Sequence, residues 1–274
     1  ENSIADVAKQ EDVLSIWNQL AERLQSVDEY VDLFKAAYPN EIINPSDITY
    51  VHAANAIGAY EDSAFRAINS PFDRYLRGSR QAMSKQAKKG MRLFYGKAGC
   101  STCHSGSFQT DQQFHAIGMP QIGPGKGDTG PSGDSYGDFG REQVTGNSND
   151  RYKFRTPTLR NVALTGPWGH NGAYNTLEAV VRHHLDVADA LENYDATQAV
   201  LPYHPDLGDS DFVHHENAEN RAAIASASEL DRVKLKEHYV KLLMEFLYSL
   251  NDPASMDLRH TIPIRVPSGL PLAD

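Results

Sequence analysis

The sequence Cys100-Ser101-Thr102-Cys103-His104 contains both cysteines of this 274-residue chain. Two cysteines separated by two residues and followed by histidine are typical of c-type haem attachment, in which the thiols bond to haem vinyl groups and the imidazole binds iron. We therefore predict one covalent haem c on Cys100 and Cys103, with His104 as proximal iron ligand. Half of a zinc site is an alternative, but it would need a second ligand pair, and no other cysteine exists. A thioredoxin-like disulfide would leave His104 without a role.

The composition limits the size of the fold and the choice of partners. A length of 274 residues suits one large or two modest domains, and 40% hydrophobic residues support a folded core. No apolar run is long enough to span a membrane. The formal net charge of −10 argues against a nucleic-acid partner and slightly favours a basic redox partner, such as a cytochrome or a copper protein. A homodimer is left open.

The haem motif also predicts where the protein resides. Covalent attachment of haem takes place outside the bacterial cytoplasm, so we expect a periplasmic or otherwise extracytoplasmic protein. The chain opens at Glu1 without Met and shows no signal peptide, which leads us to expect a mature, cleaved or truncated product.

Helical periodicity dominates the sequence, whereas strand signals are nearly absent. Four of the expected helices open on a residue that can cap the first turn, namely Ser46, Ser84, Thr176 and Ser228. We expect the apolar residues of the third helix, Ile57 and Tyr60 among them, to face the interior. The predicted helices cover residues 11–25, 28–37, 46–66, 84–95, 176–185 and 228–250.

Regular periodicity is lost between residues 105 and 155, and the glycine-rich part of this stretch covers residues 123–140. Loops of this length usually carry function or wrap around something, and haem is the expected object. A phosphate-binding loop is the alternative, but the stretch has no Gly-Lys-Ser/Thr sequence. Residues 203–216 are rich in His and Asp, and their irregular spacing favours a solvated insertion over a metal site. The sequence therefore predicts a mostly α, cytochrome c-like haem domain with long loops.

A second stretch, residues 154–172 (FRTPTLRNVALTGPWGHNG), resembles the C-terminal haem domain of the bacterial di-haem cytochrome c peroxidase and MauG superfamily. The sequences at 176–178 (TLE), 70–75 (SPFDRY) and 114–120 (FHAIGMP) are similar to the same family. The resemblance covers essentially the whole chain, and the TPTLRN…HNG run is highly specific.

The resemblance implies two domains. Residues 1–75 are similar to the helices that complete a first cytochrome c-like haem domain, and residues 76–274 are similar to the C-terminal cytochrome c-type haem domain. In this family peroxide reacts at the N-terminal haem, while the C-terminal haem relays electrons or shares oxidising equivalents. The family's first CxxCH and its distal glutamate would lie before Glu1. A second haem is therefore expected on a missing N-terminal part or on a separate fragment that acts as a partner.

The resemblance thus implies the electron-transfer haem c portion of a di-haem peroxidase or MauG-like enzyme. We expect the isolated chain not to be catalytic, and no catalytic residue is assigned. A stand-alone mono-haem cytochrome without catalysis is the main alternative, and a scaffold that keeps its haem for folding is a third. The intact mass of the purified material, with its haem count, would separate the first two.

The resemblance places the sixth iron ligand, commonly Met or Tyr in the family, at His184. The predicted helix 176–185 also carries His183, which points about 100° away, so only one of the two can face the iron. A solvated histidine pair is one alternative, and Met119 is another, although its thioether is better suited to the pocket wall. Ligation by His104 and His184 would leave a low-spin, low-potential iron without an open position.

Other site residues follow from the same resemblance. The family binds calcium between its domains through backbone carbonyls that match Thr165 and Pro167, and a simple proline turn is the equal alternative. Arg155 or Arg160 is a candidate partner of a haem propionate, because a guanidinium binds a carboxylate in bidentate fashion. Trp168 is a candidate relay between haems, with a packed aromatic ring as the alternative.

Overall fold

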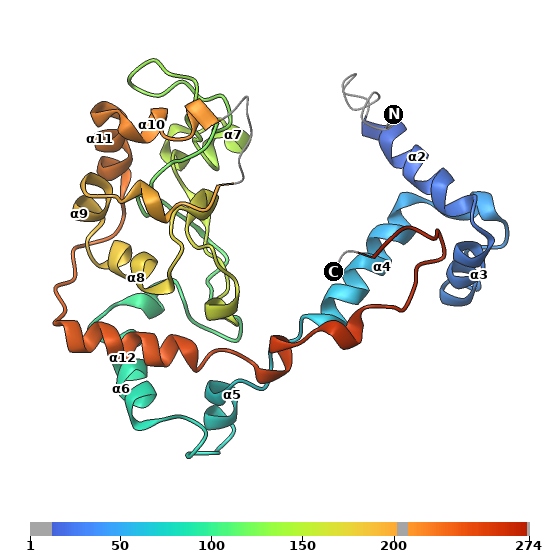
Figure 1. Ribbon diagram of the computed structural model, residues 1–274, viewed down its shortest axis with the longest axis horizontal. Coiled ribbons are helices and arrows are strands. Elements are labelled where there is room, and N and C mark those ends of the chain that lie inside the picture. Colours follow the sequence, from blue (N-terminus) through green and yellow to red (C-terminus); the bar gives the residue numbers. More distant parts are fainter. Residues whose placement is uncertain (1–12, 202–207, 273–274) are drawn as a thin grey trace. The chain divides into compact units, whose positions relative to one another are not determined.

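The computed structural model describes residues 13–201 and 208–272, which form two compact units. The first unit consists of Glu1–Arg66 and Asp257–Asp274, and the second of Ala67–Met256. Helices dominate both units (Figure 1), so the predicted mostly α class is confirmed. The expected assignment of 1–75 and 76–274 to two haem domains stays a prediction. Among the described helices, none is long and apolar enough to cross a membrane.

Three helices make up most of the first unit: α2 (Val13–Gln25), α3 (Asp28–Ala37) and α4 (Tyr50–Ala64). The first two confirm the predictions over 11–25 and 28–37, except that residues 11 and 12 lie outside the described residues. The start predicted at Ser46 for the third helix is wrong, because Pro45–Asp47 forms a separate 3-10 turn. The cap is Thr49, whose backbone N–H donates to Nδ1 of His52 at 3.1 Å.

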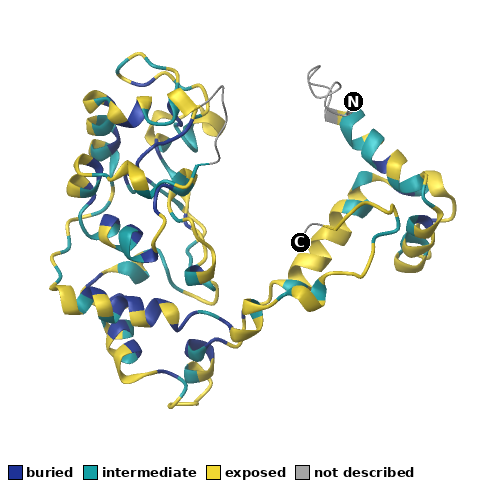
Figure 2. Cartoon of the chain, in the orientation of Figure 1, coloured by how far each residue is buried: buried dark blue, intermediate teal, exposed yellow. Residues whose placement is uncertain are grey.

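The core of the first unit is small. It is formed by Val31, Ile42 and Ile48, with partly buried side chains around them. Helix α4 contributes no buried residue, as its exposed surface in Figure 2 shows. The prediction that Ile57 and Tyr60 face the interior is wrong, since they are 55% and 45% exposed. Their spacing marks an apolar face of α4, but the described part of this unit does not cover that face.

The second unit is built around helices α6 and α12, which pack against each other, with α6 beneath α12 in Figure 1. Gly90 permits this close approach, because a Cβ there would lie 1.8 Å from the carbonyl oxygen of Leu242. Phe246 is fully buried between Phe72 and Phe94, with ring centroids 5.2 and 5.0 Å away. The helices of this unit are α5 (Pro71–Leu76), α6 (Lys85–Phe94), α7 (Glu142–Thr145), α8 (Leu177–Leu185), α9 (Val187–Glu192), α10 (Val213–Glu216), α11 (Ala218–Ala227) and α12 (Glu237–Tyr248).

Local capping explains where several of these helices begin. Ser84 and Thr176 accept backbone N–H bonds from the third helical residue, which confirms the predicted starts of α6 and α8. Helix α5 begins in the same way, because Ser70 caps it and Pro71 occupies its first position.

The helix predicted over residues 228–250 begins only at Glu237. Ser228 instead ends α11. The segment between them is not helical, because its backbone bonds to distant segments: Glu229 N–H donates to the Ala116 carbonyl at 2.8 Å and Val233 N–H to the Leu185 carbonyl at 2.9 Å. The start predicted at Ser228 is therefore wrong, and tertiary hydrogen bonds are the reason.

Residues 105–155 are largely irregular, as predicted. Their sheet content is one antiparallel pair, β1 (Phe114–His115) with β2 (Phe154–Arg155). The glycine-rich loop packs on α10 and α11, since a Cβ at Gly130 would lie 2.6 Å from the ring of His214. These contacts do not support the expectation that the loop wraps the haem.

The prediction of a solvated insertion is wrong for His214 and His215, which are 1% and 8% exposed. His214 donates from Nδ1 to Asp134 at 2.8 Å, a residue of the glycine-rich loop. The polar residues predicted at 203, 204 and 206 lie outside the described residues. The loop and α10 therefore form one buried polar contact region.

Candidate haem-attachment site

The CxxCH motif follows α6 directly and forms a tight turn. Gly99 adopts a left-handed conformation with φ 71°, and Cys100–Thr102 forms a 3-10 turn. The backbone N–H of His104 then donates to the Cys100 carbonyl at 3.0 Å. Both cysteines are free and half-buried. Burial raises the pKa of Cys100 to about 11, which keeps its thiol protonated.

His104 is held by the loop that follows the motif. Its Nδ1 donates to the backbone carbonyl of Gln109 at 3.1 Å. Burial lowers the pKa of His104 to about 4, and His184 lowers it further by charge repulsion. The ring is therefore neutral at pH 7, and within the described part of the chain it forms a hydrogen bond through Nδ1 alone. This arrangement leaves Nε2 for iron, with the carbonyl orienting the ring.

His184 has a matching arrangement. Its Nδ1 donates to the carbonyl of Val180, one helical turn earlier, at 2.7 Å. Burial lowers the pKa of His184, which favours the neutral ring that metals bind. A positive charge on His184 would disfavour protonation of His104, so the pKa values of the two rings depend on each other. Two neutral imidazoles with Nε2 free are the donor set of a six-coordinate haem iron, so these residues fit a haem c on the two cysteines.

His183 has a different environment. It is fully buried and hydrogen-bonded at both nitrogens: the Tyr174 hydroxyl donates to Nδ1 at 2.9 Å, and Nε2 donates to the Ile117 carbonyl at 2.8 Å. Ligation of iron would break one of these bonds in a buried site, which is costly. The geometry therefore favours His184 over His183. Met119 is 7% exposed and packs in the main core, near Gly169.

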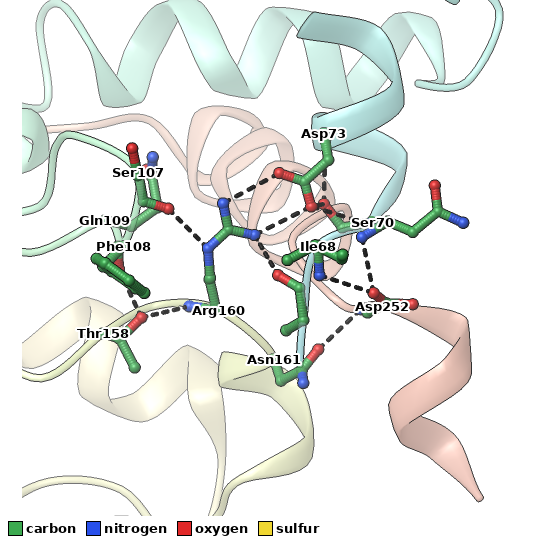
Figure 3. A network of polar contacts seen from close by, with 12 residues as sticks. Ile68, Ser70, Asp73, Ser107, Phe108, Gln109, Thr158, Arg160, Asn161 and Asp252 are labelled. Atoms are coloured by element: carbon green, nitrogen blue, oxygen red, sulfur yellow. Dashed lines mark hydrogen bonds and ion pairs between the residues drawn. The ribbon is translucent and has the colours of Figure 1, made fainter. Parts of the chain in front are cut away.

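Arg160 braces the attachment loop (Figure 3). Its Nε donates to the Ser107 carbonyl at 2.7 Å, and its two terminal nitrogens donate to the two oxygens of Asp73 at 3.0 and 3.1 Å. This bidentate pair occupies the edge that a haem propionate would need. Arg155 is exposed and donates to the side chain of Gln112. The predicted propionate contact is therefore better suited to Arg155 than to Arg160, and it stays a prediction.

The rest of this network ties three segments together. Thr158 donates through its hydroxyl to the Phe108 carbonyl in the attachment loop. The carboxylate of Asp252 accepts the backbone N–H of Ile68 at 2.9 Å, and the side-chain oxygen of Asn161 accepts the Asp252 N–H at 2.8 Å (Figure 3). The TPTLRN stretch thus connects the attachment loop, the start of α5 and the end of α12.

The remaining predicted site residues lie after this stretch. Thr165 and Pro167 are exposed, and no backbone hydrogen bond to their carbonyl oxygens occurs among the described residues. Those oxygens suit a calcium ion, whose binding stays a prediction. Trp168 donates from Nε1 to the Val162 carbonyl at 2.7 Å and packs against the main core. These contacts are those of a packed aromatic residue, and its relay role stays a prediction.

Sequence reasoning missed two residues beside the motif. Gln109 has φ 53° and is 5% exposed, and nothing in the sequence marks it as the partner of His104. His115 lies between two carboxylates, Asp111 at 2.9 Å and Glu229 at 2.8 Å, which raise its pKa, with Glu229 as the largest cause. The spacing of four residues between Asp111 and His115 was a local signal, whereas Glu229 is distant in sequence.

Comparisons with known proteins agree with the fold and the motif. A family model described as di-haem cytochrome c peroxidase matches residues 2–81. The chain is 40% identical over 157 residues to cytochrome c551 peroxidase of Pseudomonas aeruginosa, which covers 56% of this chain and 42% of that protein. It is 36% identical over 169 residues to the methylamine utilization protein MauG of Methylorubrum extorquens, which covers 61% of this chain and 42% of that protein.

A solved structure is similar in fold. The di-haem peroxidase BthA of Burkholderia thailandensis aligns with a TM-score of 0.53 at 18% identity, covering 82% of this chain and 57% of that chain. The fold and the CxxCH turn define a mostly α protein of the cytochrome c type. Together with the sequence matches, they support the di-haem cytochrome c peroxidase and MauG superfamily as the family of this chain. The chain spans less than half the length of the two relatives.

Proposed function

We propose that this chain is the electron-transfer haem c portion of a di-haem cytochrome c peroxidase or MauG-like oxidoreductase. Cys100 and Cys103 would hold the haem, and His104 and His184 would bind its iron. The observation that carries the proposal is the matched pair of neutral imidazoles. Each donates its Nδ1 proton to a backbone carbonyl, and neither Nε2 has a hydrogen-bond partner among the described residues. When bound, the haem supplies a centre that accepts and donates one electron.

The protein's own residues keep this centre closed. Gln109 fixes the tautomer of His104, and Val180 fixes that of His184, so both rings present the same nitrogen. Because His104 and His184 would both bind the iron, peroxide would have no position at which to bind. Both imidazoles are half-buried, which limits the reorganisation of solvent that accompanies electron transfer.

Further parts of the proposal concern the whole protein. A second haem on an N-terminal part or a separate fragment would react with peroxide and would receive electrons from this one. Calcium bound by the carbonyls of Thr165 and Pro167 would join the two parts. We place the protein in the periplasm, and a redox protein would supply its electrons.

A stand-alone mono-haem cytochrome is the second candidate. It is favoured by one observation: the second unit contains the CxxCH turn, both histidines and a core of its own. Such a protein would exchange electrons without catalysing peroxide reduction.

Steady-state peroxide reduction by the haem-loaded chain tests the main proposal. The chain should reduce hydrogen peroxide poorly by itself, and adding an N-terminal haem-bearing part should restore turnover. His184→Gly should open the iron and increase peroxide reactivity, whereas Lys126→Gln, which alters an exposed side chain, should have no effect. Rapid peroxide turnover by the unaltered single-haem chain would contradict the relay role. Intact mass and haem count of co-purifying material distinguish the two candidates.

A further inference from the structure

Residues 74–97 carry a concentration of positive charge that the net charge conceals. This segment has eight lysines and arginines and no aspartate or glutamate. Since the whole chain has a formal net charge of −10, the remaining residues carry −18. We call the eight residues the basic face. They are Arg74, Arg77, Arg80, Lys85, Lys88, Lys89, Arg92 and Lys97.

The charges of the basic face are exposed and not neutralised. Seven of the eight side chains are exposed, and Lys88 is half-buried over the ring of Tyr75 at 5.4 Å. Within the described residues, none of the eight forms an ion pair, whereas Arg151 and Arg232 elsewhere in this unit do. Arg77 donates only to neutral oxygens, those of Ile68 and Asn69. The positive potential of this surface is therefore not cancelled by its own neighbours.

In α6, helix geometry gathers three of the charges on one side. In α6 the exposed Lys85, Lys89 and Arg92 follow helical spacing, while Ala87, Gly90 and Phe94 are buried on the opposite side towards α12. The turn before α6 is exposed in Figure 2. The neighbouring helix α12 exposes Glu245, which forms no ion pair with any described residue, and Lys241, so that these two charges offset each other. The face therefore remains positive.

The basic face is also linked to the candidate iron ligand. Tyr95, 42% exposed at the end of α6, donates through its hydroxyl to the side-chain oxygen of Gln109 at 2.9 Å. The backbone carbonyl of Gln109 accepts the Nδ1 proton of His104 at 3.1 Å. Leu76, 65% exposed, adds an apolar side chain to the same segment. A charged rim with exposed apolar residues and a hydrogen-bonded route to the ligand are the elements of a redox docking surface.

We propose that the basic face is the docking surface for an acidic redox protein, and that electrons enter through Tyr95, Gln109 and His104. In the transfer step, the reduced partner loses one electron and the ferric haem gains it, so no proton or bond is exchanged. This inference rests on the proposed relay function. It reverses the expectation of a basic partner that the net charge of −10 suggested, because the potential at the contact governs association.

Two oxidants of opposite charge test the surface by kinetics. The reduced, haem-loaded chain is mixed in stopped flow with hexacyanoferrate(III), an anion, or with hexaammineruthenium(III), a cation. The triple variant Lys85→Gln, Lys89→Gln, Arg92→Gln should slow the reaction with the anion about 5-fold to 10-fold at low ionic strength, and less than about twofold at high salt. The reaction with the cation should not slow.

A matched control removes the same number of charges elsewhere. Arg23→Gln, Lys35→Gln, Lys126→Gln changes the net charge equally at residues that form no ion pair in the described chain. It should alter the rate with the anion by less than about twofold. Equal slowing by the two triple variants, or an anion rate that rises with salt in the unaltered chain, would overturn the proposal.

Two binding measurements do not depend on electron transfer. Hexacyanochromate(III), a redox-inert paramagnetic anion, should broaden amide NMR signals within residues 74–97. By calorimetry, a lysine-succinylated cytochrome c should bind the chain, and the unmodified basic cytochrome c should bind more weakly.

If these results hold while electron transfer fails, the relay function is wrong and the acidic-partner surface stands. The proposal of an acidic redox partner would be overturned if the succinylated protein did not bind and the chain bound anionic phosphatidylglycerol vesicles or duplex DNA instead.

Discussion

The two units differ in how much of their apolar surface they bury. The second unit packs α6, α8 and α12 around a core that includes fully buried Phe246. The first has a core of Val31, Ile42 and Ile48, and α4 contributes nothing to it. Large apolar side chains of the first unit remain in solvent, among them Leu33, Val51 and Phe65, which are 54–64% exposed.

This difference indicates that packing of apolar side chains stabilises the second unit more than the first. An exposed apolar face on a helix marks a contact surface. It supports the proposal that residues 1–75 complete a haem domain whose other part lies elsewhere. The second unit encloses its own core and the haem-attachment turn, so its stability should depend on its own side chains and on haem.

Loss of covalent haem should have the largest effect and should be confined to the second unit. Cys100→Ala with Cys103→Ala removes both thiols, so intact-mass measurement should find no haem adduct. Thermal unfolding by circular dichroism should then show a lower transition for the second unit alone. Ser101→Ala with Thr102→Ala is the control within the same turn and should retain haem. An unaltered chain without a haem adduct would refute the attachment site.

Truncation of an apolar side chain should have the next largest effect on stability, and this effect should differ between the two units. Phe246→Ala opens a cavity in the main core and should lower the free energy of unfolding by about 3–5 kcal/mol. Ile57→Ala on exposed α4 should change it by less than about 0.5 kcal/mol. Urea unfolding measures both values. A large loss at Ile57 in the isolated chain would show that α4 is covered after all.

Two aspartates, one in each unit, allow the contributions of a partly buried and an exposed ion pair to stability to be compared. Asp73 is 7% exposed and bonded to Arg160 and Ser70, whereas Asp62 of α4 pairs with Arg66 in solvent. Asp73→Ala leaves a partly buried arginine unpaired and should lower the free energy of unfolding by about 3 kcal/mol. Asp62→Ala should cost less than about 0.5 kcal/mol. Similar losses in the two variants, measured by urea unfolding, would contradict the bracing role of Arg160.

A smaller effect should appear on acidification of the second unit. Burial lowers the pKa of His215 to about 4, from a usual value of 6.5. The folded state keeps the ring neutral while the unfolded state binds a proton, so its stability is fully present above pH 6.5 and declines between pH 6.5 and 4. At pH 5 the loss should be about 2 kcal/mol. His215→Phe keeps an aromatic ring against Tyr194 and should remove this part of the pH dependence. An unchanged pH profile would show that His215 is not protonated on unfolding.

Local sequence signals predicted some elements correctly and failed where distant partners decide. Ser84 and Thr176 marked helix starts because capping is a local interaction. The late start of α12 could not be predicted, since the hydrogen bonds of Glu229 and Val233 go to segments far away in sequence. The apolar spacing of α4 indicated a face, but spacing does not reveal what covers it.

The same distinction applies to the candidate site. The CxxCH motif is contiguous and could be recognised from sequence alone. The preference for His184 over His183 depends in the structure on the Tyr174 hydroxyl and the Ile117 carbonyl, which satisfy both nitrogens of His183. No spacing rule gives those partners. Gln109, which orients His104, was missed for the same reason.

Ligation of the iron by His104 and His184 is the central claim, and electron paramagnetic resonance of the ferric, haem-loaded chain tests it most directly. The unaltered chain should give a low-spin spectrum of two nitrogen axial ligands at neutral pH. His184→Ala should convert it to high spin, and His184→Met should keep six-coordination with a higher reduction potential. A high-spin spectrum of the unaltered chain, or a low-spin spectrum unchanged by His184→Ala, would contradict the assignment.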